Sequence, residues 1–193
     1  MEECTAEEVQ RLLPLVSAQR REQAMKYKHV FGQYCCLKSW EMLSEQVLPS
    51  TRPVQNQYTP PTEWRDFEYN PNGKPFLPGG PYFSISHCRS GIAVATDDQP
   101  IGIDIEAIRH AEEDLIRRVM NAEEQEKVHS GANEQEQARI FTRLWTQKEA
   151  LVKAQGVGIA SFEQLQQVLA QNDEWTIETH EEEKYIYSIA YKK

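Results

Sequence analysis

Five stretches of the chain are rich in apolar and β-branched residues, several of them in alternation with polar residues, which is typical of β-strands. They occupy residues 82–87, 91–96, 101–106, 175–180 and 184–191. Short turns join the first three stretches and predict an antiparallel meander, while an acidic turn joins the last two and predicts a terminal hairpin. The hydrophobic pattern therefore predicts antiparallel sheet in the second half of the chain.

Apolar residues at helical spacing predict helices elsewhere. The segment from Thr5 to about Val47 is helical in character, with a capping box beginning at Thr5 and a break at Pro14 before a second, basic helix. Further helices are predicted at residues 111–129, 133–155 and 161–170, and Gly156 and Gly158 are expected to end the second of these. Eight of the ten prolines lie between residues 49 and 81, which predicts a long ordered loop or a link between two lobes.

Composition and charge exclude several classes of protein. A chain of 193 residues with 39% hydrophobic content can bury a core without disulfides. The net charge of −9 argues against nucleic acid as a partner. We expect neither export nor membrane insertion, because the N-terminus lacks an apolar segment and no 18 apolar residues run together. The four cysteines lack C-x-x-C spacing and are interpreted as reduced thiols of a cytoplasmic protein.

The stretch IGIDIE at residues 101–106 places two carboxylates on one face of a predicted strand. Side chains alternate along a strand, so Gly102, Asp104 and Glu106 share one face and the isoleucines share the other. The acidic face could simply be wet. Alternatively, Asp104 and Glu106 could be two ligands of a hard divalent cation, which would need a third carboxylate from another element.

The predicted helix around WTQKEALVK offers that third carboxylate. Glu149 and Lys153 lie four residues apart, beside an apolar stripe that includes Trp145. They could form an ordinary surface ion pair. Because the stripe indicates partial burial, they could instead face a cleft.

Two other motifs offer groups for binding phosphate. Lys74 follows an Asn-Gly turn, where it could be a solvated turn residue or a cation for a phosphate. Ser86 and His87 end a predicted strand, where they could cap or pack the strand or donate hydrogen bonds to phosphate oxygens.

The order of these motifs resembles that in the 4′-phosphopantetheinyl transferases of the Sfp type. The matching stretches are NGKPFL for the GKP loop, FSISHC for an SHS-like strand end, IGIDIE for the acidic strand, and RLWTQKEALVKAQGVGI for the W-(S/T)-x-KE-(A/S)-x-x-K helix. The resemblance covers about residues 68–160, with a weaker echo in the basic helix from Arg20 onward. It identifies the chain as a member of that family.

The resemblance implies an activity and a metal site. The protein would transfer the 4′-phosphopantetheine arm of coenzyme A to a serine of an acyl or peptidyl carrier protein, releasing adenosine 3′,5′-bisphosphate. Asp104, Glu106 and Glu149 would hold Mg²⁺ against the coenzyme A pyrophosphate. The alternative is a catalytically inactive relative that binds coenzyme A or the carrier. A nucleotide-dependent phosphotransferase is disfavoured, because the sequence contains no P-loop.

The resemblance also implies roles for other residues. Coenzyme A phosphates would be bound by Lys74, Ser86, His87 and Lys153, with Arg20 meeting the 3′-phosphate. Lys153 would neutralise or protonate the leaving oxygen. Glu149 or Glu124 would accept the proton of the carrier serine, and the sequence does not choose between them.

The implied fold is α+β, with two similar lobes related by a pseudo-twofold axis. Each lobe would be an antiparallel sheet packed on a helix, with the active site in the cleft between them. Residues 1–80 would form the N-terminal lobe, with the basic helix and the Pro-rich link, and residues 81–193 the C-terminal lobe with the metal-binding strand and helix. A two-lobe chain is expected to act as a monomer.

The chain departs from the family pattern in three places. An opening helix replaces the usual first strand, which predicts a smaller sheet in the N-terminal lobe. Cys88 follows the Ser-His pair where relatives have serine, and Tyr34-Cys35-Cys36 stands where polar contacts to the adenosine end are expected. Because the chain is acidic, docking of an acidic carrier would need a local basic face, for which the candidates are Arg109, Arg117, Arg118 and Arg139.

Overall fold

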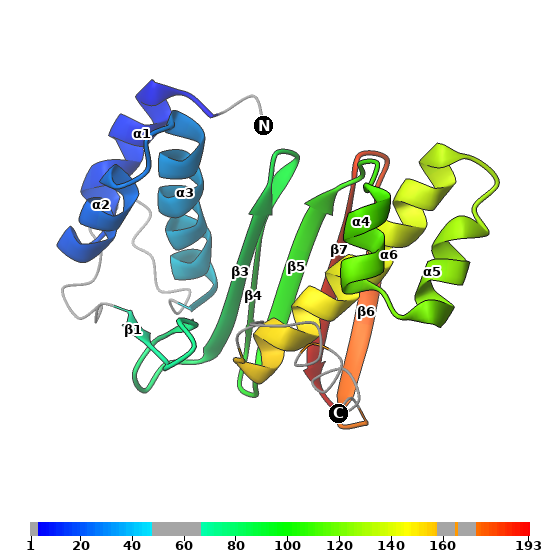
Figure 1. The fold of residues 1–193 in the computed structure, drawn as a ribbon. Coiled ribbons are helices and arrows are strands. Elements are labelled where there is room, and N and C mark those ends of the chain that lie inside the picture. The colour runs from blue at the N-terminus through cyan, green and yellow to red at the C-terminus, as the bar shows by residue number, and fades with distance from the viewer. Residues whose placement is uncertain (1–3, 48–66, 158–164, 166–172) are drawn as a thin grey trace.

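The structure, a computed structural model, describes residues 4–47, 67–157, 165 and 173–193. It confirms the α+β class: helices and antiparallel strands follow one another along the chain (Figure 1). The predicted helix at 161–170 and most of the Pro-rich link lie outside the described residues, Leu165 excepted. Within the described residues, no helix has the length and apolar character needed to cross a bilayer.

The N-terminal helices begin and end close to where the sequence predicts. Helix α1 (Ala6–Leu12) is capped by Thr5, whose hydroxyl accepts a hydrogen bond from the Glu8 amide, and Pro14 lies in the following 3₁₀ turn (Leu13–Leu15). The expected single basic helix is wrong, because it is divided into α2 (Ala18–Met25) and α3 (Val30–Val47). The division lets α2 fold back onto α3.

The strands of the described residues form three small antiparallel sheets. Strand β1 (Glu68–Tyr69) pairs with β2 (Pro75–Phe76), and β3 (Tyr82–Cys88) with β4 (Gly91–Asp97). The third sheet has the order β5-β7-β6 and consists of β5 (Ile101–Ala107), β7 (Tyr185–Lys192) and β6 (Trp175–Glu181). The β3–β4 and β6–β7 hairpins confirm two of the predicted pairings.

The predicted meander is wrong at its third strand. Strand β5 pairs with β7, which lies far away in the sequence, and not with β4. On its other side β5 meets side chains of β3, because the Ser84 hydroxyl accepts a hydrogen bond from the Ile103 amide at 3.0 Å. The turn lengths predicted the β3–β4 hairpin. They could not show that the distant strand β7, and not β4, forms hydrogen bonds with β5.

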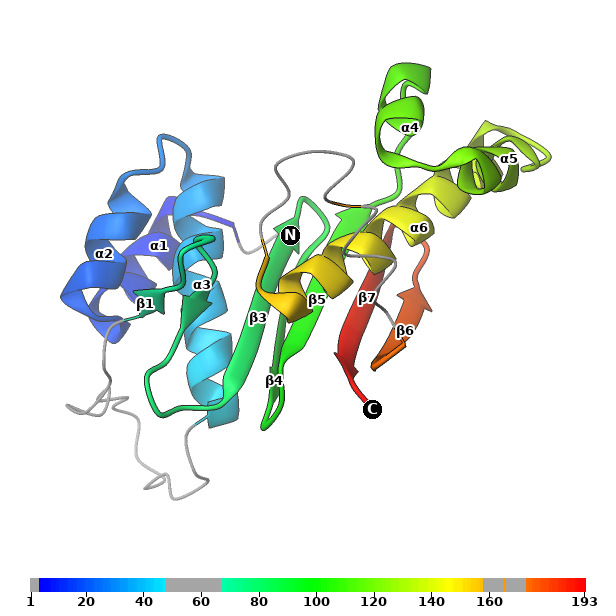
Figure 2. The same ribbon diagram turned by 60° about the horizontal axis from the view of Figure 1, so that its bottom comes forward.

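Between β5 and Gly156, three helices are described. Helices α4 (Glu113–Val119) and α5 (Ala122–His129) replace the one helix predicted at 111–129, and Asn121 caps the second of them. Helix α6 (Glu134–Gln155) lies across one face of the β5-β7-β6 sheet, as Figures 1 and 2 both show. It ends at Gly156, as predicted, with the left-handed φ of 69° that favours glycine at a helix end.

Two of the four groups of buried side chains among the described residues lie beside the predicted site. Trp40 of α3, Phe67 and Phe83 of β3 pack in sequence, with ring centroids 4.6 and 4.9 Å apart, and join the N-terminal helices to the β3–β4 hairpin. Ala150 and Ala154 of α6 pack with Ala190 of β7. Strand β5 contacts both β3 and α6, so the elements that carry the predicted site lie together (Figure 1).

Candidate active site

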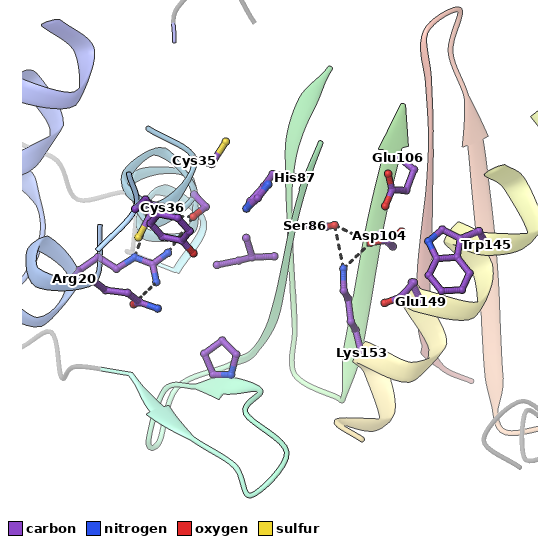
Figure 3. A pocket seen from close by; sticks show the side chains of 15 residues that line it. Arg20, Cys35, Cys36, Ser86, His87, Asp104, Glu106, Trp145, Glu149 and Lys153 are labelled. Carbon is purple, nitrogen blue, oxygen red and sulfur yellow. Dashed lines mark hydrogen bonds and ion pairs between the residues drawn. The ribbon is translucent and has the colours of Figure 1, made fainter. Parts of the chain in front are cut away.

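Three elements bring a serine, an aspartate and a lysine into direct contact. The Lys153 ammonium of α6 lies 2.6 Å from Asp104 Oδ1 of β5 and donates to Ser86 Oγ of β3 at 3.0 Å. The Ser86 hydroxyl donates to the same Asp104 oxygen at 2.8 Å (Figure 3). The structure therefore brings together residues that lie up to 67 positions apart in sequence.

Helix α6 can approach β5 this closely because position 102 is glycine. A Cβ atom at Gly102 would lie 1.9 Å from the Ala150 carbonyl oxygen and 2.4 Å from the Ala154 amide nitrogen. Those are backbone atoms of the helix, so no side-chain rotation could make room. Gly102 shares a strand face with Asp104, and its contact with α6 places Lys153 over that face.

The wet-strand interpretation of IGIDIE is wrong. Asp104 is 3% exposed, and its Oδ2 atom has no hydrogen-bond partner among the described residues. The surface-pair interpretation of Glu149 with Lys153 is also wrong, because Lys153 pairs with Asp104 instead. Buried polar atoms normally have partners, so this oxygen is available to bind a group that enters the pocket.

The other two carboxylates, Glu106 and Glu149, lie close enough to Asp104 for its negative charge to raise their pKa values. Burial raises the pKa of Glu106, the Asp104 charge adds to the rise, and Arg109, Lys153 and a hydrogen bond from Trp145 oppose it. Burial also raises the pKa of Glu149, with Lys153 opposing. Within the part of the chain that the structure describes, no three such side chains converge tightly enough to form a ready-made metal cluster.

A pocket of about 460 Å³ opens over these carboxylates. Its floor includes Asp104, Glu106 and Glu149, and its far wall comes from helices α2 and α3, including Arg20 and Cys36 (Figure 3). Pockets of this size accept small-molecule ligands.

Arg20 lies in the α2–α3 wall and is only 8% exposed. Its guanidinium donates to the Cys36 carbonyl, to Gln23 Oε1 and to Ser39 Oγ, and it stacks 5.2 Å from the centre of the Phe67 ring. All three hydrogen-bond acceptors are neutral. Arg20 therefore brings a positive charge to the pocket without a carboxylate partner among the described residues.

His87 lies at the rim of the same pocket, where its ring is partly exposed and meets Phe31 edge-to-face at 6.1 Å. Partial burial lowers the pKa of His87, and the nearby Lys153 charge lowers it further. The imidazole is therefore mainly neutral at pH 7 and can act as a hydrogen-bond donor or acceptor.

Comparison with known proteins identifies the family. Residues 100–192, which include β5, α6 and β7, match the model of the 4′-phosphopantetheinyl transferase superfamily. The chain is 31% identical over 155 residues to a 4′-phosphopantetheinyl transferase of Bacillus pumilus, covering 79% of this chain and 63% of the relative. It is 28% identical to the transferase Sfp of Bacillus subtilis, covering 80% of this chain and 66% of the relative. The chain belongs to this superfamily.

The similarity to these transferases covers only part of each relative. A transferase from Nostoc is 35% identical over 121 residues, covering 58% of this chain and 51% of the relative. The chain spans about two thirds of the length of the Bacillus transferases or slightly less.

Two residues to which the resemblance assigns roles do not line this pocket. Lys74 lines a neighbouring pocket of about 350 Å³ instead, which shares Glu149 and Lys153 with the first. The Lys74 ammonium donates to the backbone carbonyls of Ile101 and Lys153, and burial lowers its pKa to about 8. Since Lys74 is half-buried, its interpretation as a solvated turn residue is wrong.

Glu124, the second candidate base, is also outside the pocket lining. Its carboxylate lies 2.7 Å from the ammonium of Lys148, which is only 3% exposed, and accepts a hydrogen bond from the Asn121 amide. Sequence reasoning missed Lys148, although it stands directly beside Glu149 in the transferase motif. It also missed Trp145 as a pocket residue, because an apolar stripe is usually read as core. Cys36, which the sequence places at the position of expected ligand contacts, does line the pocket.

Proposed function

We propose that this protein transfers the 4′-phosphopantetheine arm of coenzyme A to a serine of an acyl or peptidyl carrier protein. The observation that carries the proposal is the contact of Lys153 with Asp104 and Ser86, beside Glu106 and Glu149, in one pocket of a chain that belongs to the transferase superfamily. A relative that only binds coenzyme A would have no need to retain this constellation. Catalysis therefore explains the site better than binding alone.

The carboxylates of the pocket fit a magnesium ion. Asp104, Glu106 and Glu149 supply only oxygen ligands, which Mg²⁺ prefers, and the buried Oδ2 of Asp104 has no partner among the described residues. When bound, Mg²⁺ would offset the negative charge of the coenzyme A pyrophosphate. It would also relieve the mutual repulsion that contributes to the raised pKa of Glu149.

The remaining pocket residues suit the coenzyme A phosphates. Ser86 and His87 would donate hydrogen bonds near the pyrophosphate, and Arg20, whose described partners are all neutral, would meet the 3′-phosphate. Lys153 would turn from Asp104 toward the oxygen that leaves.

In the reaction, the carrier serine oxygen forms a bond to the β-phosphorus, and the bond from that phosphorus to the bridging oxygen breaks. Adenosine 3′,5′-bisphosphate leaves, and the Lys153 ammonium neutralises or protonates its new terminal oxygen. Of the two candidate bases we propose Glu149 to accept the serine proton, because it lines the pocket beside Lys153 and Asp104. Glu124 is bound to Lys148 instead.

The position of the pocket bears on how the chain is divided into lobes. The pocket lies between helices α2 and α3 on one side and β5 with α6 on the other, which supports a cleft between two lobes divided near residue 80. We propose that the two lobes are related by a pseudo-twofold axis and that the chain acts as a monomer. All four cysteines are unpaired, which supports a role in the reducing cytoplasm.

The direct test is the intact mass of an apo carrier protein after incubation with this protein, coenzyme A and Mg²⁺. We expect a gain of about 340 Da, the mass of the phosphopantetheine arm, and no gain without coenzyme A. Coenzyme A that binds by calorimetry without any mass change, on acyl and peptidyl carriers alike, would indicate the inactive alternative.

Magnesium binding is testable without turnover. Mg²⁺ that binds only the folded state raises the melting temperature, so we expect a rise for the wild type and a much smaller one for Glu106→Gln. Without metal at pH 7, Glu106→Gln should be the more stable protein, because burial disfavours the charged carboxylate. A raised pKa costs stability only while the group is ionised, so this advantage should shrink as pH falls toward the ordinary pKa of glutamate.

We expect an acidic carrier protein to dock on exposed arginines near the site. Two of the four candidate arginines have partners, since Arg117 pairs with Asp114 and Arg139 with Glu181. Arg109 and Arg118 are exposed, and Arg109 acts on the charge of Glu106 at the edge of the site. We expect the KM for the carrier to rise with salt, and Arg109→Ala to weaken that dependence. A KM that is independent of ionic strength would contradict this docking.

A further inference from the structure

The turn between β1 and β2 holds the end of the helix that carries Lys153. Asn70 Oδ1 accepts hydrogen bonds at 2.9 Å from the amides of Asn72 and Lys74, and the Gly73 amide donates to the Asn70 carbonyl, also at 2.9 Å. Gly73 takes a left-handed φ of 83° that side chains rarely adopt. These bonds fix the turn, so its side chains project in defined directions.

Three side chains of this turn bind backbone carbonyls at the C-terminal end of α6. Lys74 Nζ donates to the Lys153 carbonyl at 2.5 Å. Asn70 and Asn72 donate through their side-chain amides to the Gly156 carbonyl at 2.8 and 3.1 Å. The last carbonyls of a helix lack partners within the helix, and a positive charge is favourable there. The turn therefore caps α6 from outside.

Lys74 also ties that helix end to strand β5. The same ammonium donates to the Ile101 carbonyl at 3.1 Å. Ile101 lies three residues before Asp104, and Lys153 itself supplies the other carbonyl. One cation thus bridges the two elements whose side chains form the Lys153–Asp104 ion pair.

We infer that the Asn70–Lys74 turn positions Lys153 for the reaction, and that Lys74 is a positioning residue instead of a ligand of coenzyme A. Two of the three N–H groups of Lys74 are committed to backbone carbonyls. The side chain lines the neighbouring pocket and is absent from the lining of the pocket that holds Asp104. A phosphate could use only the one remaining N–H group unless Lys74 left the helix end. The kinetic part of this inference rests on the proposed function.

The substitution Lys74→Met separates the two roles, because it keeps the apolar stem and removes the ammonium. We expect kcat for transfer to fall about tenfold or more, since a displacement near 1 Å can cost up to about 100-fold, while the KM for coenzyme A stays within about twofold. A KM that rises about tenfold with kcat retained would overturn the inference and make Lys74 a phosphate ligand. Lys184→Met, on the exposed β6–β7 turn, is the matched control and should change neither constant.

Hydrogen–deuterium exchange tests whether the Asn70–Lys74 turn holds the end of α6, and it does not depend on activity. Amides at the end of α6, residues 150–157, should exchange faster in Lys74→Met than in the wild type, and unchanged exchange would overturn the inference. If Lys74→Met does not fold, Asn72→Ala serves, because it removes only one exposed donor to Gly156. If Lys74→Met exchanges faster but the wild type transfers no phosphopantetheine, the Asn70–Lys74 turn still holds the end of α6, and the proposed function is rejected.

Discussion

Replacing Gly102 with alanine should lower the free energy of unfolding by about 3 kcal/mol or more, the upper end of what overpacking costs in a core. The added methyl group would lie 1.9 Å from the Ala150 carbonyl oxygen, so α6 must move away from β5. That movement opens the packing of Ala150 and Ala154 on the sheet and draws Lys153 from Asp104. Chemical denaturation measures the loss, and the surviving folded protein should transfer poorly.

Gly91→Ala is the matched control for this substitution. Gly91 lies in the neighbouring strand β4, but a Cβ atom there would approach only the Ile105 Cδ1 atom, at 3.1 Å. A side-chain end can move aside, so the expected cost is below about 1 kcal/mol. Equal stability of the two variants would contradict the assignment of Gly102 as the point that sets the spacing between α6 and β5.

Replacing Glu149 with glutamine should lower kcat/KM for transfer by at least about 100-fold, or about 2.7 kcal/mol of transition-state stabilisation. The change keeps the shape of the side chain and removes a charge that we assign both to the metal and to the serine proton. The melting temperature without Mg²⁺ should stay equal or rise, because burial already disfavours the charged form. The increase in melting temperature on adding Mg²⁺ should be lost.

Glu124→Gln distinguishes this site from its alternative. It removes the partner of Lys148, whose ammonium is buried, so it should destabilise the protein by about 3 kcal/mol, the cost of leaving a buried charge unpaired. The variant that remains folded should still transfer at a temperature well below its melting point. Full activity in Glu149→Gln, with activity lost in folded Glu124→Gln, would reverse the assignment of the base.

Much of the local structure followed from short-range pattern. The limits of β3, β4 and β5 agree with the predicted strands within one residue, because alternation, turns and β-branched residues act over a few positions. The break at Pro14 and the stop at Gly156 also followed, since each depends on the backbone chemistry of one residue. The division of the basic helix between Met25 and Val30 did not, because no proline marks it.

In the candidate site, the types of residue were predictable from the sequence, but the contacts between them were not. The residue types and their order could be read from the sequence: the acids of IGIDIE, the Glu149–Lys153 pair and the Ser-His strand end, together with the resemblance to the transferase family. The fold was needed to find that Lys153 pairs with Asp104, that Lys74 caps a helix and that Glu124 binds Lys148. These contacts join residues between 24 and 79 positions apart. Spacing along the chain cannot specify them, because they depend on how closely α6 packs on β5.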